Sequence, residues 1–208
     1  MNTITIDNFL TQEDFEKLSN VSLEKTESNQ ISVYHNLIDS KQNVKADCLD
    51  VSTVKRLNKN YHFKAMDILK KLYPEKCELY EYSEFHIIET GSDYKYPIHD
   101  DTPNKLLSGV IYLRPKKNSG TIFYKNKKGE EKKEIEWRQN RAVFFSRKER
   151  STWHSYQGDG KNNRVALVYN LMTNDIKKVC NIENKNYFLT RIRHSINPYL
   201  YRFFKFLI

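Results

Sequence analysis

The stretch from Tyr96 to Asp101 reads Tyr-Pro-Ile-His-Asp-Asp and ends in one imidazole and two carboxylates. If this stretch is a β-strand, His99 and Asp101 project from one face and Asp100 from the other, because side chains alternate along a strand. An imidazole and a carboxylate that share a face are suitable ligands for a transition metal such as iron(II). The spacing therefore predicts a metal site that uses His99 and Asp101.

A third metal ligand has to come from another part of the chain. His154, within 151–156, is our candidate, and His86 is the alternative. Three protein ligands on one face of an octahedral iron(II) ion leave three positions for a bidentate 2-oxoacid and for oxygen. The predicted site is therefore open on one side.

Arg164 lies ten residues after His154 and opens the strand-like segment 164–171. Alternation along this segment places Arg164, Ala166 and Val168 on one face. A guanidinium among apolar neighbours on an inward face needs an anionic partner, because a buried unpaired charge is costly. A dicarboxylate cosubstrate such as 2-oxoglutarate would supply that anion. The alternative is an edge-strand arginine that points to solvent.

Short strand-like runs that extend to about Leu171 are predicted to position these residues. The runs are rich in aromatic and β-branched side chains, and glycines separate them. We predict strands near 78–89, 95–101, 107–114, 120–124, 132–137, 141–146, 151–156 and 163–171. Eight short strands with hairpin-like spacing predict a mainly β (α+β) fold, namely a double-stranded β-helix, or jelly roll, that opens at one end.

N-terminal helices are expected to brace the jelly roll. Within 3–20, a short strand is followed by a helix for which Thr11 is a suitable N-cap. A second helix is predicted over 51–73, where apolar residues recur every three or four positions and Pro74 ends the pattern. Residues 31–38 are a candidate strand. We predict one domain over 1–175.

The tail, 176–208, carries seven basic residues and one acidic residue, a large share of the formal net charge of +9. The remaining chain is only mildly basic, so we expect no nucleic-acid partner. The aromatic and basic residues of the tail predict a helix to Ser195. Peripheral membrane contact through 186–208 is one interpretation, and docking of Phe203 and its neighbours on the jelly roll or a second subunit is the other.

The cysteines and the first residues of the chain suggest a cytoplasmic protein. Cys48, Cys77 and Cys180 form no close pair in the sequence, which predicts neither a disulfide framework nor a zinc–thiolate site. The first seven residues include an acid and lack the basic and apolar runs of a signal peptide. No run of about eighteen apolar residues predicts a membrane span. Nothing in the sequence indicates the oligomeric state.

Several short motifs occur in a fixed order between about residues 80 and 171. They are Tyr96 three residues before His99, the strand 108–113 with Ser before Tyr-Leu, the turn 120–123 (Gly-Thr-x-Phe), the strand 142–145 (Ala-x-x-Phe), His154, and Arg164 ten residues later. This ordered set resembles the catalytic domain of the iron(II)- and 2-oxoglutarate-dependent oxygenases, in particular the prolyl 4-hydroxylase-like branch.

The resemblance implies a dioxygenase that hydroxylates a C–H bond while 2-oxoglutarate and O2 give succinate and CO2. It implies that His99, Asp101 and His154 hold Fe(2+). Asp101 favours hydroxylation, since halogenating relatives replace this carboxylate with a small residue. A small molecule, a glycan precursor or a peptide side chain is the expected substrate.

The resemblance also implies roles for residues outside the metal ligands. Arg164 and Tyr112 would bind the C5 carboxylate of 2-oxoglutarate, and Tyr96 would line the cosubstrate or substrate pocket. The chain differs from many relatives at Glu89, where they carry Tyr, and at Ser119, where they carry Gly. Prolyl specificity is therefore not carried over.

Two other functions remain as alternatives. One is a jelly-roll module that binds another metal or a ligand without redox chemistry. The other is a nucleic-acid demethylase, although that branch uses further arginines after the distal histidine and none follows Arg164 until Arg191. Binding of both iron(II) and 2-oxoglutarate would distinguish an oxygenase from the non-redox binding module.

Overall fold

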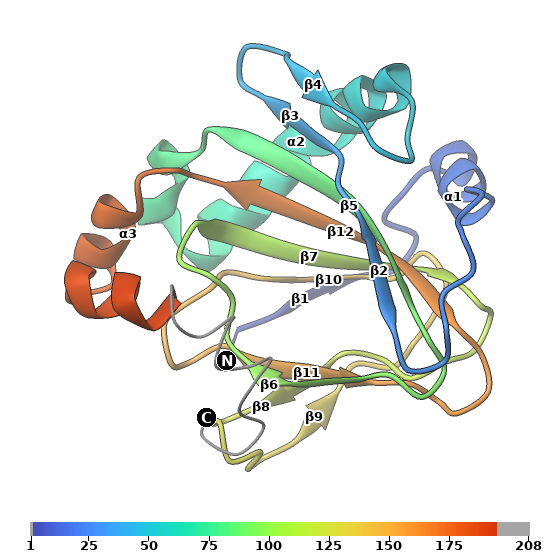
Figure 1. Cartoon of the computed structure of the whole chain (residues 1–208). Helices are drawn as coiled ribbons and strands as arrows, with labels where there is room; N and C mark the ends of the chain where they lie inside the picture. Colours follow the sequence, from blue (N-terminus) through green and yellow to red (C-terminus); the bar gives the residue numbers. More distant parts are fainter. Residues whose placement is uncertain (1, 195–208) are drawn as a thin grey trace.

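The computed structural model describes residues 2–194, in which antiparallel strands form two sheets that face each other (Figure 1). The larger, eight-stranded sheet has the order β1 (Ile4–Ile6), β10 (Ala142–Phe145), β7 (Lys105–Arg114), β12 (Arg164–Met172), β5 (Tyr82–Thr90), β3 (Leu37–Asp39) and β4 (Val44–Lys45), and β2 (Ile31–Tyr34) also pairs with β5. The four-stranded sheet has the order β6 (Lys95–His99), β11 (Trp153–Gln157), β8 (Ile122–Tyr124) and β9 (Lys133–Glu134). The predicted mainly β jelly roll is confirmed.

Several of the predicted strands differ from the observed ones. The strands expected over 95–101 and 132–137 are shorter, since β6 ends at His99 and β9 covers only Lys133–Glu134. The strand expected over 78–89 begins at Tyr82, because the 3-10 helix η1 (Pro74–Leu79) precedes it and proline suits the first position of a helix. The strand expected over 31–38 is divided into β2 and β3 at Asn36. The Asn36 side chain donates to the carbonyl of Phe85 at 3.1 Å, so it takes the place of one backbone donor of the ladder, and it accepts the N–H of Asp47 at 2.9 Å.

Helices cover the outer face of the larger sheet, as predicted. In α1 (Gln12–Ser19), the hydroxyl of Thr11 accepts the N–H of Asp14 at 3.2 Å and caps the helix. The longer helix, α2 (Val51–Leu72), is capped by Asp50 and buries the predicted apolar stripe. Its buried residues include Val54, Leu57, Tyr61, Ala65 and Ile68.

Alternation along β12 divides the interior into two parts. Leu167 and Tyr169 belong to the core between the larger sheet and the helices. Arg164, Ala166 and Val168 face the other way, toward a cavity between the two sheets, as their spacing predicted. The sheet therefore separates an apolar core from the candidate site.

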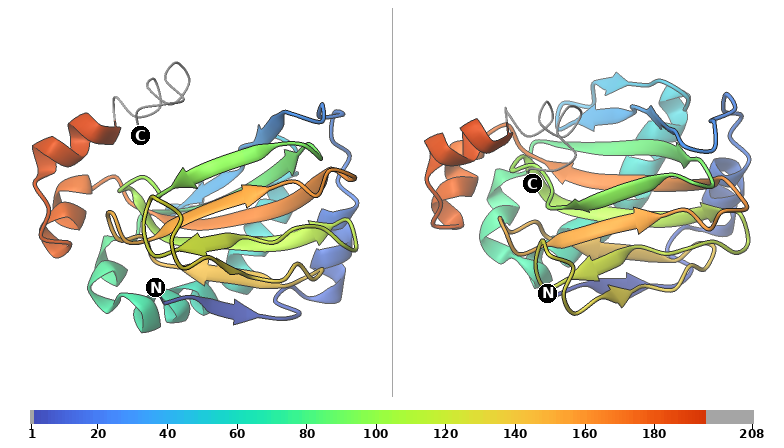
Figure 2. Two further views of the ribbon diagram at one scale, coloured as in Figure 1. Left: turned by 90° about the horizontal axis from the view of Figure 1, so that it is seen from below. Right: turned by 60° about the horizontal axis from the view of Figure 1, so that its bottom comes forward.

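The described part of the tail contains α3 (Ile176–Ile182) and a helix over 187–194, both at one end of the sheets (Figure 2). A helical tail is thus present, while its predicted end at Ser195 and the aromatic residues after it lie outside the described residues. The division into a domain over 1–175 and a tail over 176–208 stays a prediction, as does peripheral membrane contact through 186–208. No helix within 2–194 is long and apolar enough to cross a membrane.

Candidate metal centre and cosubstrate pocket

The side chains of His99, Asp101 and His154 come together between the two sheets. One ligand atom from each lies within 4.8 Å of the others, and no second such group occurs within residues 2–194. His99 ends β6 and is paired with His154 of β11 across the smaller sheet, which brings their ring centroids to 4.2 Å. Asp101 lies two residues beyond His99 on the same side. The arrangement offers two imidazoles and one carboxylate to a single ion.

Hydrogen bonds to the backbone orient both imidazole rings. The Nδ1 atom of His99 lies 3.0 Å from the carbonyl oxygen of Pro97, and that of His154 lies 2.9 Å from the carbonyl oxygen of Thr152. An Nδ1–H that donates to these carbonyls leaves the Nε2 lone pair for a metal ion. Burial lowers the pKa of His99 to about 3 and also lowers the pKa of His154. Both rings are therefore neutral near pH 7, the form that binds metals.

Both carboxylate oxygens of Asp101 have a partner. The ammonium of Lys105 donates to Oδ1 at 2.8 Å, and the hydroxyl of Ser108 donates to Oδ2 at 2.6 Å. Burial raises the pKa of Asp101, but the charge of Lys105 and its hydrogen bond outweigh this effect and hold the pKa of Asp101 below its usual range. Asp101 is thus an ionised candidate ligand that its neighbours hold in place.

Asp100 and His86, the two other candidates for the metal site, point elsewhere. The carboxylate of Asp100 accepts the backbone N–H of Arg150 at 3.0 Å and pairs with Arg193 at 2.9 Å. His86 lies on β5, where its ring centroid is 4.6 Å from that of His35. Neither belongs to the group of three ligands.

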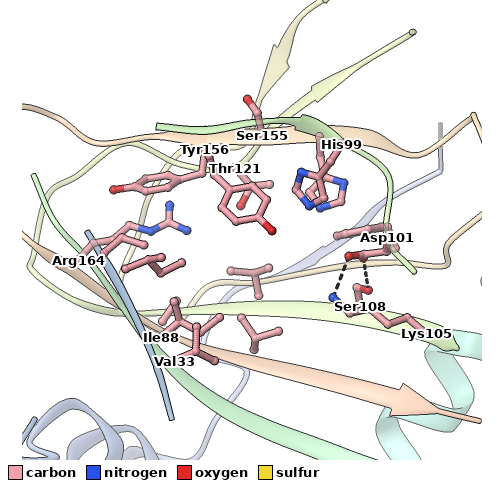
Figure 3. Close-up of a pocket in the computed structure, with 18 residues that line it drawn as sticks. Val33, Ile88, His99, Asp101, Lys105, Ser108, Thr121, Ser155, Tyr156 and Arg164 are labelled. Atoms are coloured by element: carbon pink, nitrogen blue, oxygen red, sulfur yellow. Dashed lines mark hydrogen bonds and ion pairs between the residues drawn. The ribbon is translucent and has the colours of Figure 1, made fainter. Parts of the chain in front are cut away.

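A cavity of about 200 Å³ extends from the three candidate ligands to Arg164. Figure 3 shows Arg164 and Tyr156 on one side of this cavity and His99 and Asp101 on the other. Apolar side chains of the larger sheet form the wall between them, and they include Ile88, Val110, Ala166 and Val168. A bound molecule can therefore reach the candidate metal ligands and Arg164 from one apolar chamber.

Arg164 is a buried cation without an acidic partner among residues 2–194. Its guanidinium carbon lies 3.2 Å from the ring centroid of Tyr156, and Nη1 donates to the carbonyl of Ser119 at 3.3 Å. Burial lowers the pKa of Arg164. The hydroxyls of Tyr156 and Thr90 are also buried without a hydrogen-bond partner in the described chain. A carboxylate ligand fits this environment, because it would satisfy the cation.

The two tyrosines assigned to the pocket occupy different positions. Tyr96 lines the cavity, and its ring centroid is 4.4 Å from that of His99. Tyr112 is fully buried behind Thr121, which itself lines the cavity. The Tyr112 hydroxyl accepts the N–H of Thr121 at 2.8 Å and donates to its Oγ1 at 3.0 Å. The contact of Tyr112 with the cosubstrate stays a prediction.

Replacing Tyr112 with phenylalanine is expected to lower the free energy of unfolding by about 1–2 kcal/mol, because the buried N–H of Thr121 loses its acceptor. Urea denaturation of the metal-free protein measures this loss. If the hydroxyl also reaches the cosubstrate, binding of 2-oxoglutarate weakens about tenfold in the same variant, a cost of about 1.4 kcal/mol. Unchanged binding would restrict Tyr112 to a packing role.

The sequence did not reveal several residues of the cavity. Ile31 and Val33 of β2 line it, although the surrounding segment 21–50 had no assigned function. Their alternation with polar residues was the available signal. Lys105 also lines the cavity, and nothing in the sequence indicated its contact with Asp101.

Comparisons with solved structures identify the fold. An oxidoreductase of the 2OG-Fe(II) oxygenase family from Burkholderia pseudomallei aligns with a TM-score of 0.58 and 14% identity over 82% of this chain and 84% of that chain. A prolyl-4-hydroxylase from Pseudomonas putida aligns with a TM-score of 0.50 and 16% identity over 82% of this chain and 92% of that chain. The chain has the fold of the 2OG-Fe(II) oxygenases.

A third structure with the 2OG-Fe(II) oxygenase fold contains a bound peptide. It is a prolyl hydroxylase from Trichoplax adhaerens in complex with a peptide fragment of the hypoxia inducible factor oxygen degradation domain. It aligns with a TM-score of 0.53 and 14% identity over 85% of this chain and 86% of that chain. No family model and no curated protein sequence matches the chain. The resemblance seen in the motifs is thus confirmed as a shared fold.

Proposed function

We propose that the protein is an iron(II)- and 2-oxoglutarate-dependent dioxygenase that hydroxylates its substrate and releases succinate and CO2. One observation carries the proposal: a group of two imidazoles and one carboxylate shares a cavity with the buried guanidinium of Arg164, which has no acidic partner within residues 2–194. The first feature suits iron(II), and the second suits the far carboxylate of a dicarboxylate cosubstrate.

The residues that carry the proposal have separate tasks. His99, Asp101 and His154 hold Fe(2+), and Arg164 binds the C5 carboxylate of 2-oxoglutarate. When bound, iron and 2-oxoglutarate supply the oxidising chemistry through O2. The apolar wall of the larger sheet excludes water from the reacting groups.

The proposed substrate is a small molecule, a glycan precursor or a peptide side chain. A peptide is bound to the Trichoplax prolyl hydroxylase, which supports a peptide as one of these choices. Tyr96 is 36% exposed beside His99, so it is placed where a substrate would approach the metal. We assign Tyr96 to the wall of the substrate pocket.

Anaerobic addition of iron(II) and 2-oxoglutarate tests the proposed function. We expect a weak visible charge-transfer band, because the cosubstrate keto group and carboxylate would chelate the ion, and we expect succinate after air is admitted. His99→Ala is expected to abolish both, since it removes one of the three metal ligands.

The control is His62→Ala, which removes a histidine of α2 that packs on Tyr80 away from the cavity. It should keep the band. A protein that binds iron(II) and yields neither the band nor succinate would instead be a non-redox metal-binding module.

A further inference from the structure

Polar contacts hold the helix over 187–194 against the rest of the protein. Its side chains Phe188 and Leu189 are 73% and 68% exposed, whereas Thr190 is buried. Little apolar area of this helix is therefore removed from water. Its position depends on the hydrogen bonds and ion pairs that it makes.

Glu183, which follows α3, is fully buried between two cations. Its Oε1 lies 2.7 Å from the ammonium of Lys76 in η1, and its Oε2 lies 2.6 Å from Nη1 of Arg147. It also accepts the backbone N–H of Glu149 at 3.0 Å. A buried carboxylate is stable only when it is fully paired, so these contacts fix α3 against the loop 146–152 between β10 and β11.

The loop 146–152 also binds the segment that carries two metal ligands. Nε of Arg147 donates to the backbone carbonyl of Asp101 at 3.2 Å. The backbone N–H of Arg150 donates to Asp100 Oδ2 at 3.0 Å. The same loop leads into β11 and His154, so it connects all three candidate ligands.

Arg193 links the tail directly to this segment. Its Nη2 lies 2.9 Å from Asp100 Oδ1, and its Nη1 lies 3.1 Å from Glu149 Oε1. The hydroxyl of Thr190 donates to Glu149 Oε2 at 2.8 Å. The side chain of Asp100 is only 2% exposed. Since Asp100 separates His99 from Asp101, the tail touches the residue between two proposed ligands.

We propose that Arg193 is a positioning residue for the metal centre and that segment 176–194 acts as a clasp on residues 99–101. This inference rests on the proposed function, which assigns the metal ion to the site. The pairing of β6 with β11 ends at His99, and Asp101 lies beyond it. The backbone there has no neighbouring strand to fix it, so its conformation depends on side-chain contacts such as Asp100 with Arg193.

Loss of Arg193 leaves one oxygen of a buried carboxylate without its donor. Asp100 can then recover hydrogen bonds only by moving toward water, and Asp101 moves with it because the two are adjacent in the chain. Groups that orient metal ligands from outside the coordination sphere typically change metal affinity by about 10- to 100-fold. The clasp therefore acts on metal affinity through the position of Asp101.

Titration of the metal-free full chain with Co(II) tests the clasp. Arg193→Gln is expected to raise the dissociation constant about tenfold and to alter the visible Co(II) spectrum. Asp100→Asn should also weaken Co(II) binding, and the loss in the double variant should be smaller than the sum of the two single losses, because the two variants share the Asp100–Arg193 pair. Hydrogen exchange in the metal-free Arg193→Gln protein should be faster over 99–103 and 147–152.

Arg191→Gln is the matched control, because Arg191 is exposed on the same helix and, within residues 2–194, its side chain hydrogen-bonds only to the hydroxyl of Tyr187, at 3.4 Å. Arg193→Lys should restore part of the affinity. If Arg193→Gln matches Arg191→Gln in both Co(II) affinity and hydrogen exchange, the clasp is overturned. If Arg193→Gln does not fold, Asp100→Asn removes the same contact from the other side and is compared with Arg191→Gln in its place. A wild-type protein that binds no Co(II) counts against the proposed function, while the exchange comparison still decides the clasp.

Discussion

Replacing Arg164 with methionine is expected to raise the dissociation constant of 2-oxoglutarate about 100-fold, which corresponds to about 2.7 kcal/mol. The guanidinium is buried at one end of the cavity and has no acidic partner within residues 2–194. Removing one partner of a buried, hydrogen-bonded charge pair typically costs about 2–5 kcal/mol of binding free energy, because the other charge is left unpaired. Calorimetric titration of the Mn(II)-loaded protein measures the change without turnover.

The same substitution is expected to change the free energy of unfolding by no more than about 1 kcal/mol. Burying the unpaired cation costs several kcal/mol. Stacking on Tyr156 stabilises the buried guanidinium by about 2 kcal/mol, and the hydrogen bond to the Ser119 carbonyl by about 1.5–3 kcal/mol. These contacts therefore nearly offset the cost of burying the charge. Urea denaturation of the metal-free protein checks this. A large loss of stability would mean that Arg164 serves the fold rather than a ligand.

A shortened cosubstrate shows whether Arg164→Met loses affinity for the C5 carboxylate in particular or for every 2-oxoacid. The 2-oxoacid 2-oxobutyrate lacks the C5 carboxylate, so wild-type protein and Arg164→Met should bind it equally. Arg138→Met, a change at an exposed arginine that pairs with Glu136, is the matched control and should leave both affinities unchanged. If Arg164→Met still prefers 2-oxoglutarate over 2-oxobutyrate, Arg164 does not bind the far carboxylate.

Local patterns in the sequence predicted much of the fold and of the candidate site. Alternation with a period of two is a property of neighbouring residues, so it placed Arg164 with Ala166 and Val168 without knowledge of the fold. The same argument separated Asp101 from Asp100, and the hydrogen bonds of Asp100 agree with it. The helix over 51–73 followed from an equally local period of three to four residues.

Contacts between distant parts of the chain could not be predicted in this way. Arg193 and Asp100 are 93 positions apart, and their pairing depends on how α3 docks beside the loop 146–152. The contact of Lys105 with Asp101 is closer in sequence, but the four-residue spacing lies outside a helix, where it carries no directional meaning. Both contacts depend on the tertiary arrangement of the chain, which no short sequence pattern specifies.

Replacing Asp101 is the second change with a large expected effect. It should affect metal binding and stability for two different reasons. Asp101→Ala is expected to abolish metal binding and to lower the free energy of unfolding of the metal-free protein by about 3 kcal/mol. The second effect arises because the Lys105 ammonium, only 24% exposed, is left without its carboxylate. Metal titration and urea denaturation of the same variant measure the two losses independently.

Adding Lys105→Met to Asp101→Ala is expected to restore most of the lost stability and none of the metal binding. Replacing both members of a buried ion pair by apolar groups is often neutral or stabilising, whereas removing one member leaves a buried charge unpaired. A double-mutant cycle should therefore give a coupling of about 2–3 kcal/mol between the two residues. If the losses in free energy of unfolding are additive, the ion pair between Lys105 and Asp101 does not contribute to stability. Recovery of metal binding in the double variant would remove Asp101 from the set of ligands.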